Sequence, residues 1–181
     1  CCKVTTYEIF YTILGKAMAK VITTRLGTLD PSKTIVTYTL RFEGDYKVDR
    51  FTSEKFNQAE LLAKALAREL KLNDPIETVY AKHPLKGKSQ KKLSRFERYQ
   101  LTRQAYELNP DVLNRIKGKN VILVDDVRTS GATVSAISEQ LIQAEPRDIY
   151  VVVAGRSVLQ HDFEKFLSIE LKYCKPFWLK Q

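Results

Sequence analysis

Residues 121–133 decide the fold, because an apolar run, two adjacent acids and a group of small residues follow one another there. The run is Val121-Ile122-Leu123-Val124-Asp125-Asp126-Val127-Arg128-Thr129-Ser130-Gly131-Ala132-Thr133. A continuous apolar stretch such as residues 120–124 is typical of a strand buried on both faces of a parallel sheet. Apolar residues at helical spacing follow at Val134, Ile137 and Leu141. The run therefore predicts a strand, a turn and a helix, in that order.

Helices and strands alternate along the rest of the chain. Helical patterns cover residues 10–21, with Gly27 as the stop, residues 53–70, with Ser53 as the cap and Pro75 beyond the end, and residues 93–107. Strand patterns cover residues 34–40, 76–80 and 149–154, and residues 169–173 as a final edge strand. This alternation predicts an α/β fold with a Rossmann-like parallel sheet flanked by helices. In such sheets ligands bind beyond the carboxyl ends of the strands.

The bulk composition is that of one globular domain over residues 1–181. The chain has 181 residues, of which 44% are hydrophobic and 28% charged. No apolar run approaches the ~20 residues of a membrane span, and the N-terminus lacks the apolar stretch of a signal peptide. We therefore expect a cytoplasmic protein without membrane contact.

The chain begins at Cys1, so residues 1–30 are expected to form the helical N-terminal part of a chain truncated upstream. Cys1, Cys2 and Cys174 have neither the number nor the spacing of a disulfide framework. Free thiols are the favoured interpretation. The alternative is that Cys1 and Cys2 are the remnant of a zinc module that lies upstream.

Asp125 and Asp126 come directly after the predicted strand and are the candidate catalytic residues. Unpaired charge is costly inside a sheet, so two adjacent carboxylates are expected at the strand's end, facing solvent or a ligand. Adjacent carboxylates can accept hydrogen bonds from two neighbouring hydroxyls, such as those of a ribose diol. They can also hold Mg²⁺ indirectly, through water.

The residues after this acidic pair predict a phosphate-binding loop at the start of a helix. Small residues let the backbone approach an anion, and N–H groups and the helix dipole favour negative charge there. The alternative is a solvated turn with Thr129 as a helix cap. The spacing fits neither a Walker A loop nor a Gly-x-Gly-x-x-Gly dinucleotide turn. The candidate phosphate-binding residues are Val127, Arg128, Thr129, Ser130, Gly131, Ala132 and Thr133.

The whole run resembles the signature by which type I phosphoribosyltransferases bind phosphoribosyl pyrophosphate (PRPP). Two further segments resemble the ComF-like (competence protein F) phosphoribosyltransferases. Residues 56–63 are similar to that family's Arg-Gly-Phe-Asn-Gln-Ala segment, and residues 90–98 are similar to its Gln-x-x-Leu-Ser-x-x-x-Arg stretch. The resemblance covers about residues 35–157.

The resemblance implies a type I phosphoribosyltransferase fold and a reaction with PRPP. In that reaction ribose 5-phosphate passes to a nitrogen nucleophile and pyrophosphate leaves, with Mg²⁺ as the cofactor. On the pyrophosphate side the sequence departs from the family. Thr37-Tyr38-Thr39-Leu40 replaces a Pro-Val-Pro-Leu segment at the strand and pyrophosphate-side turn, and Glu54-Lys55 stands where the family has Arg-Gly.

Residues 82–103 are strongly basic, with Glu97 as their one acid, and they predict a flexible loop followed by the start of a helix. In the family a mobile loop in this part of the chain closes over PRPP. Closure of a basic loop would neutralise pyrophosphate. A nucleic-acid contact surface and a solvated charge run are the alternatives. The candidate residues on the pyrophosphate side are Arg41, Lys88, Gln90, Lys91, Lys92 and Arg98.

Two functions remain open at this point. The first is a phosphoribosyltransferase that uses PRPP and an acceptor that the sequence does not identify. The second is a non-catalytic ComF-like accessory protein in DNA uptake, which binds PRPP, a nucleotide or DNA. The net charge of +9 and the pI of about 9.4 favour polyanionic partners but do not separate the two functions. A homodimer also stays open.

Overall fold

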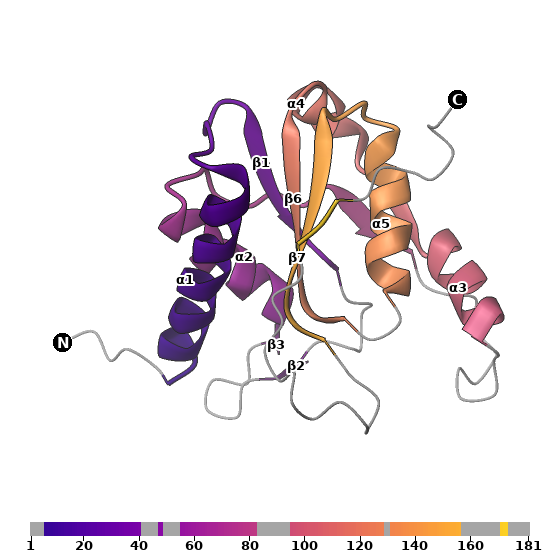
Figure 1. Ribbon diagram of the computed structural model, residues 1–181. Helices are drawn as coiled ribbons and strands as arrows, with labels where there is room; N and C mark the ends of the chain where they lie inside the picture. The colour runs from indigo at the N-terminus through magenta and orange to yellow at the C-terminus, as the bar shows by residue number, and fades with distance from the viewer. Residues whose placement is uncertain are drawn as a thin grey trace.

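The computed structural model describes residues 6–40, 47–48, 55–82, 95–128, 131–156 and 171–173, and it shows an α/β fold (Figure 1). The helices are α1 (Thr6–Leu26), α2 (Gln58–Glu69), α3 (Arg95–Gln104), the short 3-10 turn η2 (Pro110–Val112), α4 (Leu113–Ile116) and α5 (Ala132–Ile142). The strands are β1 (Thr34–Tyr38), β2 (Lys47–Val48), β3 (Lys55–Phe56), β4 (Val79–Ala81), β5 (Tyr106–Leu108), β6 (Asn120–Arg128), β7 (Asp148–Arg156) and β8 (Leu171–Tyr173).

The main sheet has the strand order β1-β6-β7-β8. β6 pairs in parallel with β1 on one side and with β7 on the other, so Tyr38, Val124 and Val152 lie side by side. β8 adds an antiparallel edge, as predicted for residues 169–173. Two antiparallel pairs, β2 with β3 and β4 with β5, stand apart from this sheet. The predicted parallel sheet flanked by helices is confirmed.

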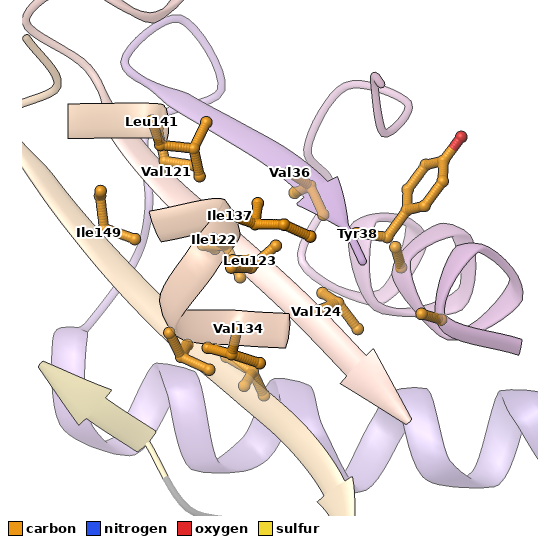
Figure 2. Packing of buried hydrophobic residues seen from close by; sticks show 14 of the residues in the cluster. Val36, Tyr38, Val121, Ile122, Leu123, Val124, Val134, Ile137, Leu141 and Ile149 are labelled. Atoms are coloured by element: carbon orange, nitrogen blue, oxygen red, sulfur yellow. The ribbon is translucent and has the colours of Figure 1, made fainter. Parts of the chain in front are cut away.

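Helices cover both faces of the sheet. In Figure 1, α1 and α2 lie on one side, and α5 and α3 lie on the other. The four residues Val121, Ile122, Leu123 and Val124 each have 0% exposure, because β6 is the strand with a helix layer on either face. Figure 2 shows this centre, where Val134, Ile137 and Leu141 of α5 pack onto β6. The carboxyl ends of the parallel strands thereby meet at one edge of a buried core.

Several predicted boundaries are wrong, and three of them have a common cause. α2 begins at Gln58, not after Ser53, because Lys55 and Phe56 pair with β2 and Asn57 caps the helix. The helix predicted over residues 93–107 ends at Gln104, and Tyr106–Leu108 turns back to pair with β4. The strand predicted over residues 76–80 begins only at Val79. In each of these three cases strand pairing that the local pattern does not reveal sets the boundary.

Glycine is required where α1 crosses α2. A Cβ atom added to Gly15 would lie 2.8 Å from the Cβ atom of Ala65 and 3.0 Å from its carbonyl carbon. Gly15→Ala is therefore expected to lower the free energy of unfolding by about 1–3 kcal/mol, although alanine favours a helix by ~1 kcal/mol. Urea denaturation measures the change. Lys16→Ala, at the next and exposed position, is the control; a stability gain in Gly15→Ala would show that the crossing is loose.

A lysine occupies the left-handed position that ends α2. Lys71 has φ 55°, and the amides of Lys71 and Leu72 bond back to the carbonyls of Arg68 and Ala67. Glycine is the residue that suits this C-terminal motif. Lys71→Gly is expected to stabilise the protein by about 0.5–1 kcal/mol, because the relief of strain exceeds the entropy gained by the unfolded chain.

Thermal and urea unfolding measure the effect of Lys71→Gly. The matched control is Lys20→Gly in the middle of α1, where the same substitution should cost about 1 kcal/mol. A loss of stability in both variants would contradict the assignment of strain to Lys71.

Candidate functional site

The candidate site lies at the carboxyl end of β6. This strand extends to Arg128, four residues beyond its predicted end, and its last part pairs Asp125 with Val153 and Val127 with Gly155 of β7. β1 stops at Tyr38, opposite Val124. From Asp125 onward β6 therefore has its strand partner on the β7 side, and the chain that follows β1 lies against Asp125 on the other side. This arrangement explains how the sheet accommodates two acids within a strand.

Asp125 is a buried carboxyl with an 8% exposed surface. Its Oδ1 accepts a hydrogen bond of 2.7 Å from the Thr39 hydroxyl and one of 3.0 Å from the Asp126 amide. Burial raises the pKa of Asp125 to about 6, the Thr39 hydrogen bond opposes that rise, and the neighbouring Asp126 charge adds to it. The group therefore titrates close to neutral pH and can accept or donate a hydrogen bond there.

Asp126 is half-buried, and its Oδ1 accepts a hydrogen bond of 2.8 Å from the Val127 amide. Two adjacent carboxyl groups offer the hard oxygen ligands that Mg²⁺ prefers. Over the described ranges no group of three or more His, Cys, Asp or Glu residues is placed to hold a metal ion. The two carboxyl groups are compatible with an ion held through water, and indirect Mg²⁺ binding at this pair stays a prediction.

The predicted phosphate loop leads into α5 through Gly131. Gly131 has φ 77° and ψ 7°, a left-handed conformation that glycine adopts without strain. Its carbonyl accepts the Ser135 amide at 2.9 Å. Ala132 and Thr133 form the first turn of α5, which carries no acidic side chain. The positive end of this helix therefore lies beyond β6 with no carboxylate of its own to neutralise it.

The rest of the predicted loop is described in part. Val127 is 52% exposed at the strand end. Arg128 closes β6 through its backbone, and nothing is described of its side chain. Thr129 and Ser130 lie outside the described residues. The structure thus brings Asp125, Asp126 and Val127 to the edge from which α5 starts.

The structure does not describe how the candidate residues of the pyrophosphate side lie relative to one another. Arg41, Lys88, Gln90, Lys91 and Lys92 lie outside the described residues, and Arg98 is placed in α3 by its backbone alone. The two basic residues at the ends of the segment 82–103 form ion pairs in the structure. Lys82 pairs with Glu107 at 2.5 Å, and Arg103 pairs with Glu139 at 2.6 Å, which ties α3 to α5.

Sequence reasoning missed three residues next to this site: Thr39, Asn57 and Tyr106. Asn57 and Tyr106 bond to the carbonyls of Thr39 and Leu40, in the turn that follows β1. One signal was present. Asn57 with Glu60 three residues later has the spacing of a helix start, which also places the cap correctly. Nothing local marks Thr39 or Tyr106, because their partners are 86 and 66 residues away.

The described part of the chain contains no helix that is long and apolar enough to cross a membrane. No match was found among curated proteins. The fold is shared with a solved structure of low sequence identity. A hypoxanthine-guanine phosphoribosyltransferase from Bacillus anthracis is 16% identical, with a TM-score of 0.51, over 92% of this chain and 76% of that one. A hypoxanthine phosphoribosyltransferase from Staphylococcus aureus is 14% identical, with a TM-score of 0.49, over 92% of this chain and 71% of that one.

A family model described as the phosphoribosyl transferase domain matches residues 57–168. This range contains α2, β6, α5 and β7, and with them Asp125, Asp126 and Gly131. It spans more than half of the 181 residues. The chain therefore belongs to the phosphoribosyl transferase domain family.

Proposed function

We propose that the protein is a phosphoribosyltransferase that binds PRPP at the carboxyl end of β6 and transfers ribose 5-phosphate to a nitrogen nucleophile. The observation that carries this proposal is the order of groups at that edge. Two adjacent carboxyl groups, Asp125 and Asp126, are followed by a left-handed Gly131 and by the start of α5. This order suits a ribose diol beside a monophosphate.

Each group has a role in the proposed reaction. Asp125 and Asp126 accept the ribose hydroxyls, and the loop of residues 127–133 takes the 5-phosphate. The bond from C1 to the pyrophosphate oxygen breaks, and its electron pair leaves with pyrophosphate. The nitrogen lone pair of the acceptor then forms the new bond to C1, and the acceptor's proton is released. Mg²⁺, held through water near the two acids, would neutralise the pyrophosphate charge.

The same proposal covers the extent of the domain, its family branch and the role of the basic segment. Residues 1–181 form a single phosphoribosyltransferase-like domain of the ComF-like branch, active in the cytoplasm. The basic segment of residues 82–103 closes over the pyrophosphate and excludes water. Catalysis then rests on positioning and on electrostatic stabilisation of the leaving group.

A second function is favoured by one observation, the concentration of positive charge between residues 82 and 103 in a chain of net charge +9. In this alternative the protein is a non-catalytic accessory factor in DNA uptake, and the basic segment binds backbone phosphates. Such binding weakens steeply as salt is raised and is independent of base sequence.

Calorimetric titration of PRPP, with Mg²⁺ and then with a chelator, tests the first function. Saturable binding that requires Mg²⁺, followed by pyrophosphate release when nitrogen acceptors are added, is expected. Titration of double-stranded DNA at two salt concentrations tests the alternative. If the protein binds no PRPP but binds DNA in a salt-dependent way, the accessory function is favoured.

A further inference from the structure

The side of α1 that is turned away from the sheet changes character along its length. Ile9, Ile13, Lys16 and Lys20 follow one another at spacings of four, three and four residues, so they form one stripe on the helix. All four are exposed, whereas the opposite side of the helix, around Met18, is buried. The stripe therefore begins apolar and becomes basic over about 17 Å.

The apolar end of the stripe is a cluster of large side chains in contact with water. Ile9 is 52% exposed, Ile13 is 61% exposed, and Phe10 beside them is 55% exposed. The Phe10 ring lies edge-on against Tyr11, with 5.6 Å between the ring centroids. Single apolar residues are common on a protein surface, but a group of them marks a contact with an apolar partner.

The basic end of the stripe lies beside α2. The two helices are in close contact at Gly15 and Ala65, where an added Cβ atom would lie 2.8 Å from that of Ala65. Asn73 Nδ2 donates to the carbonyl of Pro31, so the loops that follow the two helices are joined. The helices therefore lie side by side and end at the same edge of the sheet (Figure 1).

Positive charge continues from α1 onto α2. Lys64 and Arg68 are one helical turn apart and exposed on α2, as Lys16 and Lys20 are on α1. Of these four cations only Lys64 is paired, with Glu60 at 2.6 Å. The other three have no acidic partner within the described ranges of the chain. The outer face of the two helices thus combines unpaired positive charge with an apolar cluster.

This combination distinguishes between possible partners. A second copy of the chain would bring like charges together on the same face, which is unfavourable. A nucleic acid would contact the cations and leave the apolar cluster in water. An anionic lipid surface takes up both, because its headgroups attract cations and the boundary with the acyl chains accepts apolar side chains. Two helices side by side also offer an extended face to the plane of a bilayer.

We propose that the outer face of α1 and α2 is a docking surface for anionic lipid. Ile9, Phe10 and Ile13 enter the boundary between headgroups and acyl chains, and Lys16 and Lys20 contact the charged headgroups, with Arg68 of α2 beside them. Such contact needs no helix that crosses the bilayer. It departs from the expectation of a protein without membrane contact, and it does not depend on the proposed function.

Sedimentation with vesicles of phosphatidylcholine and phosphatidylserine, and with vesicles of phosphatidylcholine alone, measures the interaction. The unmodified protein is expected to bind the mixed vesicles and to bind them more weakly as salt is raised. Lys16→Gln/Lys20→Gln should bind about 10- to 30-fold more weakly, because each cation near an anionic surface contributes about fivefold. Ile9→Ser/Ile13→Ser should lose about 5- to 30-fold through the lost apolar contact.

The control is Arg115→Gln/Lys119→Gln, which removes two positive charges near the start of β6, outside the two helices. Its binding should stay within about twofold of the unmodified protein. Phe10→Trp reports insertion directly, because its fluorescence should shift to the blue with the mixed vesicles. The unmodified protein, with Trp178 as its single tryptophan, gives the background. Thermal unfolding checks that each variant is folded.

Binding that both helix variants lose and the control keeps supports the inference. No binding by the unmodified protein, or equal losses in the helix variants and the control, overturns it. If only the charge variant binds vesicles more weakly and it also loses double-stranded DNA, the face binds polyanions and the lipid assignment is wrong. If no vesicles are bound and Ile9→Ser/Ile13→Ser turns a dimer into a monomer, the face is an interface between copies. PRPP titration of the same variants should be unchanged, so the proposed function stands or falls separately.

Discussion

Asp125→Asn is expected to make the folded protein more stable at pH 8 and to weaken PRPP binding by about 10- to 100-fold, the usual range for a lost hydrogen bond to a charged group. Both effects have the same cause. The carboxyl group is buried, and its ionised form is disfavoured in the folded protein. Burial of this charge lowers the free energy of unfolding. A ligand that neutralises the charge or hydrogen-bonds to it offsets that cost and therefore binds more tightly.

The direction of the stability change follows from linkage. The pKa of Asp125 is about 6 in the folded protein and 3.8 in an unfolded chain. The raised pKa therefore contributes stability that is fully present below pH 3.8 and is lost as the pH rises through about 6. The difference of about two pKa units corresponds to roughly 3 kcal/mol. Asparagine carries no charge, so the variant does not lose this stability.

Urea denaturation of both proteins between pH 4 and pH 8, in the presence of a chelator, measures the change. The free energies of unfolding should agree near pH 4 and diverge by up to about 3 kcal/mol above pH 7. Asp111→Asn, an exposed aspartate in η2, is the control and should change neither stability nor PRPP binding. A variant that loses binding and stability together would instead indicate disruption of the site's structure.

The order of groups along residues 121–133 was sufficient to predict the central strand, the two acids at its end and the helix that follows. The reason is local. Four consecutive apolar residues need burial on both faces, and because unpaired charge is costly in the interior the acids were expected at the end of the strand. Asp125 is nevertheless buried, with hydrogen bonds to its carboxyl group. The prediction that the acids come after the strand was wrong in one respect, because β6 continues to Arg128 along β7. Pairing on one side is enough to extend a strand, and only the neighbouring strand reveals it.

The surroundings of Asp125 could not be predicted from the sequence. Thr39 stands where the resembled family has proline, so the resemblance pointed away from a hydroxyl at this position. Tyr106 was placed in a helix, because the helical pattern of residues 93–107 runs through it without a break. Only the pairing of Val79 with Leu108 turns this segment into a strand and directs the Tyr106 hydroxyl toward Leu40. Contacts between segments so far apart depend on the finished fold.

Thr39→Val is expected to have the opposite effect on stability at pH 8, because it removes a hydrogen bond that favours the ionised form of Asp125. Hydrogen bonds to charged groups contribute about 1.5–3 kcal/mol, and those between neutral groups about 0.5–1.5 kcal/mol. The variant should therefore lose about 1.5–3 kcal/mol at pH 8 and less at pH 4, where Asp125 is protonated in the folded protein. The pKa of Asp125 should rise further.

A double-mutant cycle separates this hydrogen bond from the packing of the valine. In the Asp125→Asn background Thr39→Val should cost about 1–2 kcal/mol less than in the unmodified protein. Thr37→Val, within β1, is the matched control, because its buried hydroxyl pairs with that of Thr78 and faces no ionisable group in that bond. Its cost should not vary between pH 4 and pH 8. If the stability cost of Thr39→Val is also independent of pH, the Thr39 hydroxyl forms a hydrogen bond to a buried oxygen atom without stabilising the charge on Asp125. The raised pKa would then reflect burial and the Asp126 charge alone.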